Sequence, residues 1–232
     1  MSGHDAPRGE LRPGDRIPRH FHARPYATVV LAGGYEEAGE GGRWRVQPGD
    51  VLLHGPFSAH LNLAPPRGAR VLNLDLPGTV RMSGAMRVAD PDRLVRLAER
   101  NPEAAPQALL DACMAGPPPT QDLPDVLANA LSVPGACGVD DWSRDQDVSR
   151  QTAFRWFRDA YGVGPARYRV EARARRAWRL IVDGAEALVD IADAAGFADQ
   201  AHMCRDVRAL TGRTPKAWRM TGLQPSFKTA LA

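Results

Sequence analysis

The feature that most constrains this chain is an internal repeat in its C-terminal half, where one pattern of residues occurs twice. The first copy spans residues 149–169 and the second spans residues 199–219, so equivalent residues lie 50 positions apart. This offset pairs Arg155 with Arg205, Gly162 with Gly212, Pro165 with Pro215, and Arg169 with Arg219. A repeat of this length indicates that one small structural unit is built twice.

Each copy is typical of a helix with a defined beginning and end. Ser149 and Asp199 suit the N-cap, because their side-chain oxygens can accept hydrogen bonds from the free N–H groups of a first helical turn. Gly162 and Gly212 suit a left-handed helix end, and a proline follows each of them. The pattern therefore predicts two equivalent helices.

A shorter helix is predicted before each copy, over residues 139–148 and 188–197. A short helix, a tight turn and a second helix with exposed arginine make a helix-turn-helix, which places its second helix in the DNA major groove. Between the copies, residues 165–183 predict a helix about 27 Å long with one apolar stripe. Such a helix would hold two recognition helices about one DNA turn, roughly 34 Å, apart. Its other faces are predicted to carry Arg167, Arg169, Arg173, Arg175, Arg176 and Arg179.

This segment resembles the DNA-binding domain of the AraC/XylS family of transcription regulators. The resemblance is carried by residues 191–200 (Ile-Ala-Asp-Ala-Ala-Gly-Phe-Ala-Asp-Gln) and by the later Arg205, Gly212, Thr214, Pro215, Trp218 and Arg219. Asp147, Ser143 and Val207 depart from it, since glycine, alanine and phenylalanine are usual there. The resemblance implies a cytoplasmic activator or repressor that is not an enzyme.

In the family, DNA contacts come from the front of each recognition helix. The resemblance therefore implies base contacts from Gln151, Phe154, Arg155, Gln200, Ala201, His202 and Arg205. Arginine can bind guanine through two hydrogen bonds, and glutamine can bind adenine in the same way. Phe154 either touches a thymine methyl or packs in the core. Arg155 and Arg205 either contact a base, contact a phosphate or lie in solvent. Phosphate contacts or plain surface charge are expected for Arg150, Arg158, Arg208 and Lys216.

Positive charge is concentrated in the half with the repeat. Residues 133–232 hold 16 Lys and Arg against 12 Asp and Glu, whereas the whole chain holds 30 against 27. Contact with DNA phosphates requires such a bias, although the same surplus also suits an ordinary solvated surface. The sequence contains neither a run of about 18 apolar residues nor an N-terminal signal core, so we expect a cytoplasmic protein with no membrane partner. Cys113, Cys137 and Cys204 are unclustered, which indicates reduced thiols.

The first 82 residues are predicted to form a β-rich domain. Residues 1–18 are expected to be an irregular lead-in. Short segments separated by Gly and Pro turns then predict strands of a sandwich or small barrel over residues 26–31, 35–38, 43–46, 51–54 and 69–76. The order of Gly14, His20, His22 and Gly33, then Gly42, Pro48, Gly49, Asp50, His60 and Asn62, resembles the two cupin motifs. This resemblance implies a cupin-like β-barrel that senses a ligand.

Three histidines are candidate ligands for a metal or an effector. His20 and His22 share one strand face, and with His60 they would offer three imidazoles to a divalent transition metal such as zinc, nickel, iron or copper. His54 is a candidate fourth ligand. Tyr26 joins the three histidines in the predicted effector site, and Tyr26 or Ala27 stands where enzyme-like cupins keep a glutamate. The competing interpretation is an apolar cavity for an organic effector, lined by Val29, Leu31, Leu52 and Leu72.

The predicted fold class is multidomain β + α. It comprises a cupin-like barrel at 1–82, a helical connector at 83–132, an all-α domain with two helix-turn-helix motifs at 133–222, and a tail at 223–232. The connector helices either dimerise or pack on their own barrel. The predicted partners are double-stranded DNA and a small-molecule effector, and the resemblance adds a homodimer and RNA polymerase. The alternatives are a metal-dependent cupin enzyme fused to a helical domain, or a DNA-binding protein whose barrel only dimerises.

Overall fold

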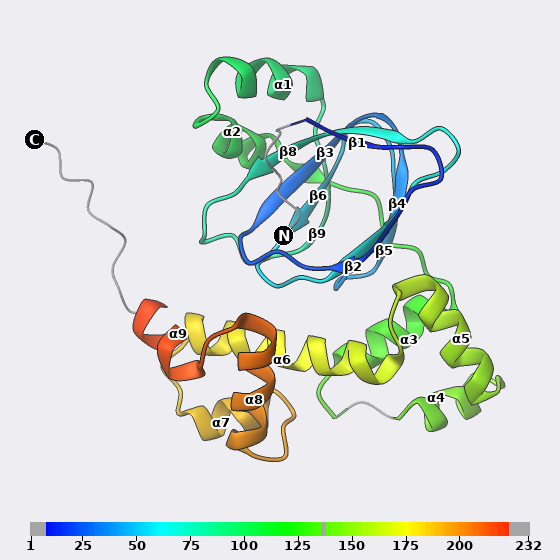
Figure 1. Ribbon diagram of the computed structural model, residues 1–232, viewed down its shortest axis with the longest axis vertical. Coiled ribbons are helices and arrows are strands. Elements are labelled where there is room, and N and C mark those ends of the chain that lie inside the picture. The colour runs from blue at the N-terminus through cyan, green and yellow to red at the C-terminus, as the bar shows by residue number, and fades with distance from the viewer. Residues whose placement is uncertain (1–7, 136–137, 223–232) are drawn as a thin grey trace, which may run out of the picture. The chain divides into compact units, whose positions relative to one another are not determined.

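The computed structural model describes residues 8–135 and 138–222, which divide into two compact units. Of the described residues, the first unit comprises 8–129 and 151–164, and the second comprises 130–135, 138–150 and 165–222. Strands fill the first part of the chain and helices the second (Figure 1). No helix within the described ranges is long and apolar enough to cross a bilayer. Cys137 and the predicted tail lie outside the described residues.

The first unit is built on two antiparallel sheets. The strands are β1 (Arg8–Leu11), β2 (Arg16–His20), β3 (Tyr26–Gly33), β4 (Tyr35–Ala38), β5 (Arg43–Val46), β6 (Asp50–His54), β7 (His60–Leu63), β8 (Ala69–Asp75), β9 (Gly84–Arg87) and β10 (Met114–Ala115). The larger sheet has the order β1-β8-β3-β6-β9-β10, and the smaller sheet has the order β2-β7-β4-β5. The β-rich fold is thus confirmed, whereas the expected closed barrel is wrong for the described strands. The chain changes sheets between β1 and β2 and between β3 and β4, so two layers form instead of one continuous ladder.

Residues 8–20 hold two strands where the sequence predicted an irregular lead-in. β1 pairs with β8, and β2 pairs with β7. Both strands lie at sheet edges and are mostly exposed, so they lack the buried alternation that marks a half-buried strand. An edge position also tolerates Pro18, which has no N–H to donate to a ladder.

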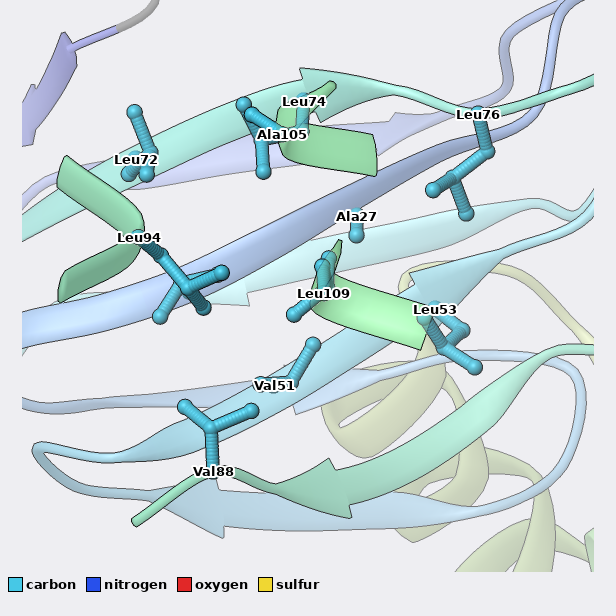
Figure 2. Close-up of a cluster of buried hydrophobic side chains, with 11 residues drawn as sticks. Ala27, Val51, Leu53, Leu72, Leu74, Leu76, Val88, Leu94, Ala105 and Leu109 are labelled. Carbon is cyan, nitrogen blue, oxygen red and sulfur yellow. The ribbon is translucent and has the colours of Figure 1, made fainter. Parts of the chain in front are cut away.

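Two helices, α1 (Pro91–Arg100) and α2 (Ala105–Ala112), cover one face of the larger sheet (Figure 2). The Asp90 side chain begins α1 by accepting a hydrogen bond from the N–H of Arg93 at 2.8 Å. Leu94 of α1 and Leu109 of α2 are buried against the apolar side chains of β3, β6 and β8. The connector helices therefore pack on their own β-rich region, as one of the two interpretations predicted.

A second core lies between the two sheets. Leu11, Val30, Leu52 and Val71 of the larger sheet pack there with Tyr35, Trp44 and Val46 of the smaller sheet. The first unit also contains most of α5 (Arg150–Tyr161) and most of α3 (Leu123–Ser132). Phe157 and Tyr161 stack within α5, with ring centroids 4.8 Å apart.

The second unit is helical. It contains α4 (Val139–Asp145), α6 (Pro165–Asp183), α7 (Leu188–Ala194), α8 (Gln200–Thr211) and α9 (Pro215–Gly222). α7, α8 and α9 all pack against α6, whose Ala177, Trp178 and Ile181 are buried. Arg175 is also fully buried, so the expectation that it lies on an exposed face of this helix is wrong. The separation of the two recognition helices stays a prediction.

Candidate nucleic-acid interface and ligand cavity

A cavity of about 180 Å³ lies between the two sheets of the first unit. Its polar lining includes His20, Tyr26, Thr28, Tyr35, His60, Asn62 and Asn73. The predicted apolar lining is wrong for three of its four residues, because Val29 and Leu72 belong to the layer beneath α1 and α2 and Leu31 packs against that layer. Leu52 lies in the core between the two sheets. Alternate strand residues point to opposite faces, so Thr28 and Asn73 take the cavity side.

The fold brings the three predicted histidines together. The ligand atoms of His20, His22 and His60 lie within 4.8 Å of one another. Nδ1 of His20 lies 2.8 Å from the carbonyl oxygen of Pro18, and Nδ1 of His60 lies 3.3 Å from that of Ser58. Because a carbonyl only accepts, both rings are assigned the tautomer that leaves Nε2 with its lone pair, which is the arrangement that orients histidine ligands.

Tyr26 completes this cluster. Its hydroxyl lies 3.0 Å from Nε2 of His60 and donates to that lone pair. Its ring stacks on His54, with centroids 4.2 Å apart and an interplanar angle of 13°. Tyr26 therefore occupies the coordinating nitrogen of His60, and a bound metal would displace its hydroxyl or recruit it.

A buried carboxylate that the sequence did not single out adjoins the cluster. Oε1 of Glu37 lies 3.5 Å from Nδ1 of His54, and Glu37, His54 and His60 form a second group that could hold a metal. Burial raises the pKa of Glu37. Burial, followed by the neighbouring His54, His20 and His22, lowers the pKa of His60, so its imidazole stays neutral. No sequence signal marked this position, because β4 is short and its residues do not alternate between buried and exposed.

The helical part of the chain contains two turns with the same hydrogen-bond pattern. After α4 the N–H of Val148 donates to the carbonyl of Ser143 at 3.0 Å, and after α7 the N–H of Phe197 donates to Ala192 at 2.8 Å. The residue before each donor is left-handed, with φ of 52° at Asp147 and 81° at Gly196. Aspartate is among the few residues that tolerate this region, which explains its place where glycine is usual.

The second recognition helix, α8, has the ends that the sequence predicted. The carboxylate of Asp199 accepts a hydrogen bond from the N–H of His202 at 2.6 Å. Gly212 ends the helix with φ of 74°, and its N–H donates to the carbonyl of Arg208 at 2.8 Å. Met203 and Val207 are fully buried on one face, so the opposite face is presented to solvent.

The exposed face of α8 carries most of the predicted DNA contacts. Gln200, Ala201, Arg205 and Arg208 are exposed there, and Lys216 is exposed in the first turn of α9. His202 differs, because its Nε2 lies 3.1 Å from Nη2 of Arg173 on α6. The structure thus turns this imidazole toward α6 and leaves it only partly accessible.

The predicted contacts on α5 are also exposed. Gln151, Arg155 and Arg158 face solvent, and Phe154 is 43% exposed. The core interpretation of Phe154 is therefore wrong, while its contact with a thymine methyl stays a prediction. Arg150 forms an exposed ion pair with Asp140 at 3.1 Å, an interaction that contributes little to stability in water.

The comparison with protein families identifies the domain that contains these helices. The helix-turn-helix domain family matches residues 142–221, a range that runs from α4 to α9. Residues 142–221 are an AraC-type DNA-binding domain. The comparison with curated proteins found no significant match.

Several solved structures are similar to parts of this chain. A transcriptional regulator with an AraC-type DNA-binding domain from Chromobacterium violaceum is 29% identical over 43% of this chain and 87% of that chain, with a TM-score of 0.37. The DNA-binding domain of AdpA, solved with a target DNA, is 25% identical over 44% of this chain and 93% of that chain, with a TM-score of 0.40. ToxT from Vibrio cholerae, solved with an unsaturated fatty acid, is 11% identical over 94% of this chain and 96% of that chain, with a TM-score of 0.41. The assignment rests on the family match and on the two turns, not on these TM-scores.

One residue that sequence reasoning missed holds the second half of the AraC-type domain together. Arg173 donates hydrogen bonds to the carbonyl of Gly196 at 3.4 Å and to the carboxylate of Asp206 at 3.1 Å. Its guanidinium carbon also lies 4.2 Å from the ring centroid of Phe197. The sequence placed Arg173 among six similar arginines, and nothing in their spacing distinguished it.

Proposed function

We propose that this chain is a sequence-specific DNA-binding transcription regulator whose N-terminal β-rich region binds an effector. The observation that carries the proposal is the AraC-type domain with its two matching turns. Each turn is followed by a recognition helix, and the equivalent Arg155 and Arg205 are exposed on these helices. Double-stranded DNA is the partner, and a homodimer and RNA polymerase are further partners proposed on family resemblance alone.

The two exposed arginines are the proposed base readers. A guanidinium matches the O6 and N7 acceptors of guanine in the major groove, and the amides of Gln151 and Gln200 match adenine. Ala201 and Phe154 provide apolar groups for a thymine methyl. We assign phosphate contacts, which position the protein without reading sequence, to Arg150, Arg158, Arg208 and Lys216.

The cavity between the sheets is the proposed effector site. Its volume of about 180 Å³ is below the roughly 300 Å³ at which drug-sized pockets begin, so we propose a small effector. His20, Tyr26 and His60 line it, and His22 lies beside His20 and Tyr26, so this cluster would bind the effector through imidazole nitrogens and a hydroxyl. Such a ligand would combine hydrogen bonds to these side chains with contacts to the apolar Leu11, Ile17 and Val71.

A divalent transition metal is the alternative effector. His20, His22 and His60 fit it, because the two backbone-bonded imidazoles point their Nε2 lone pairs away from those bonds. When bound, the metal would supply a fixed positive charge at the cavity wall. Metal analysis of untagged protein after incubation with zinc, nickel or iron tests this alternative. We expect about one ion per chain, and a stoichiometry near zero would leave only the organic effector.

Selection of bound sequences from a random DNA pool tests the regulator itself. The full chain should enrich one motif with two separate half-elements, because two recognition helices read two major-groove segments. Adding cell extract should change the enrichment if an effector is present. A pool that stays random in every condition would contradict the proposed function.

A further inference from the structure

A single strand separates the effector cavity from the C-terminal end of α5. His60 and Asn62 of β7 line the cavity, and Leu61 between them points to the opposite side of the sheet. A Cβ atom placed on Gly162, which ends α5 with φ of 73°, would lie 3.0 Å from Cδ2 of Leu61 and 3.4 Å from Cβ of Arg19. The recognition helix thus rests on the back of the cavity wall.

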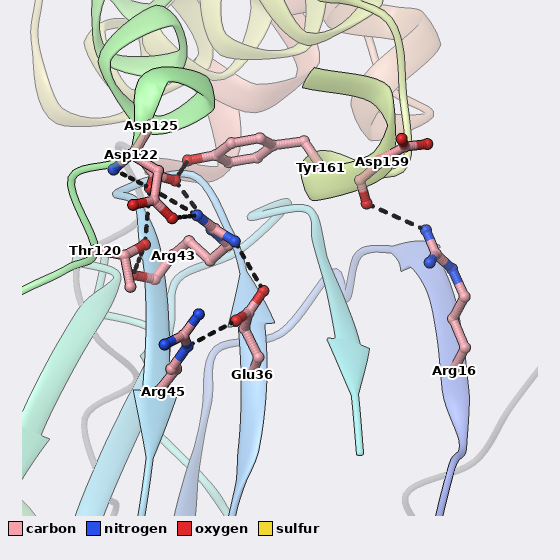
Figure 3. Close-up of polar contacts among 9 residues, drawn as sticks. All are labelled: Arg16, Glu36, Arg43, Arg45, Thr120, Asp122, Asp125, Asp159 and Tyr161. Atoms are coloured by element: carbon pink, nitrogen blue, oxygen red, sulfur yellow. Dashed lines mark hydrogen bonds and ion pairs between the residues drawn. The ribbon is translucent and has the colours of Figure 1, made fainter. Parts of the chain in front are cut away.

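A buried polar cluster fixes this end of α5 to the smaller sheet (Figure 3). The hydroxyl of Tyr161 donates to Oδ1 of Asp125 on α3 at 2.8 Å. The same carboxylate accepts hydrogen bonds from Nε and Nη2 of Arg43 on β5, at 3.2 and 3.1 Å, and from the hydroxyl of Thr120 at 2.8 Å. Nη1 of Arg43 continues to Glu36 of β4 at 3.1 Å.

This cluster is nearly closed to solvent. Tyr161 is 0% exposed and Asp125 is 1% exposed. A buried carboxylate needs such a set of donors, because an unpartnered charge in the interior is strongly destabilising. Nη2 of Arg16 on β2 also donates to the carbonyl of Asp159 at 3.5 Å, which adds a second point of attachment.

The internal repeat shows that a recognition helix does not need this attachment. Thr211 is the residue of α8 equivalent to Tyr161, 50 positions later. Its hydroxyl donates to the carbonyl of Val207 at 2.8 Å and accepts from Nε1 of Trp218 at 2.7 Å, both within the AraC-type domain. In the first copy the same position instead donates to the carboxylate of Asp125, which Arg43 of the smaller sheet holds.

We propose that the Tyr161–Asp125–Arg43 cluster is a clamp through which the contents of the cavity control the first recognition helix. Gln151 and Arg155 stay exposed while the other end of α5 is held, so the clamp positions the helix without covering its reading face. A ligand that shifts β7 would shift Leu61, and with it the end of α5. The proposal rests on the proposed function, because it assigns a regulatory role to a DNA-reading helix.

Hydrogen exchange of the full chain tests the clamp without DNA. Tyr161→Phe removes only the hydroxyl, and we expect amides in the second half of α5 to exchange about tenfold faster, as the loss of a hydrogen bond to a buried charge implies. Thr211→Val is the matched control and should leave α5 unchanged. Unchanged exchange in α5 after Tyr161→Phe would overturn the clamp, whatever the protein does with DNA.

A double-mutant cycle on operator affinity tests the route from the cavity. Asn62→Leu alters the cavity from β7, and Thr28→Val alters it from β3 of the larger sheet. We expect Asn62→Leu to change the affinity of the full chain for a selected site at least threefold. This change should disappear when Tyr161→Phe is also present, and it should remain when Thr211→Val is present instead. Thr28→Val should act independently of Tyr161→Phe. Independent effects of Asn62→Leu and Tyr161→Phe would overturn the route, whereas loss of all DNA binding by the unmodified chain would instead contradict the proposed function.

Discussion

The guanidinium of Arg173 on α6 lies 3.1 Å from the carboxylate of Asp206 on α8. Both side chains are 20% exposed, so water screens this ion pair less than the pairs on the surface. Arg173 also reaches the turn before α8 through the carbonyl of Gly196. One side chain therefore sets the position of the second recognition helix on its supporting helix.

Replacing Arg173 by alanine should destabilise this arrangement. We expect the free energy of unfolding to fall by about 1–3 kcal/mol, because the buried side of Asp206 loses a charged donor. Arg173→Lys keeps the charge but not the planar set of donors, so it should recover only part of the loss. Urea unfolding of the full chain measures both variants, and equal stability of Arg173→Ala and the unmodified protein would contradict this role.

Arg205→Ala should relax specificity at one base pair of the bound site. We expect a cost of about 1–3 kcal/mol at that position and little elsewhere, because a base contact is lost. Arg158→Ala should weaken binding to all sequences alike, since it lies further along its helix and is assigned to a phosphate. Binding to a panel of single-base variants distinguishes the two patterns. The same uniform loss for both variants would show that Arg205 does not read a base.

Glu37→Gln should stabilise the metal-free protein at high pH. The pKa of Glu37 is raised in the folded state, so its contribution to stability is complete below the unfolded value of about 4.5 and is lost as pH rises through the folded pKa. Glutamine does not titrate, and each unit of pKa elevation corresponds to about 1.4 kcal/mol. With a metal chelator in the buffer, the two proteins should have similar melting temperatures at pH 4. At pH 8 the variant should have the higher melting temperature. Parallel curves would contradict a titrating buried carboxylate.

Zinc should raise the melting temperature if His20, His22 and His60 form a site. A ligand at a hundredfold excess over its dissociation constant stabilises the folded state by about 2.7 kcal/mol. His60→Gln removes the shared ligand of both candidate groups and should abolish the shift, whereas Glu37→Gln should preserve it. A zinc shift that survives His60→Gln would place the metal elsewhere.

The helical half was predictable because its signals are local. Asp199 and Gly212 mark the ends of α8 through their own backbone and side-chain chemistry, and the repeat doubled every such signal. The strands at Arg8–Leu11 and Arg16–His20 were missed because edge strands bury few residues and so show no alternation. Their pairing with β8 and β7 depends on residues far along the chain, which no local pattern displays.

The cavity residues were likewise predictable where a local motif marked them and not where distant packing decides their position. The His20 and His22 pair was visible as a motif, and the fold brings His60 to it. The apolar lining was assigned to the wrong side of the larger sheet, because Val29 and Leu72 are covered by α1 and α2 rather than by the smaller sheet. Which face of a strand meets which layer depends on the later helices, so hydrophobicity alone left the choice open. Glu37 was missed because a lone carboxylate in a short strand carries no signal of burial.

The salt dependence of binding to a selected site, compared with scrambled DNA of the same length, tests the central claim most directly. With about six phosphate contacts, the slope of log K against log salt should be near −5 for the full chain. The selected site should also keep a large advantage over scrambled DNA at every salt concentration, because base contacts are not screened in the same way. Equal affinity for the two DNAs across the titration would contradict a sequence-specific regulator.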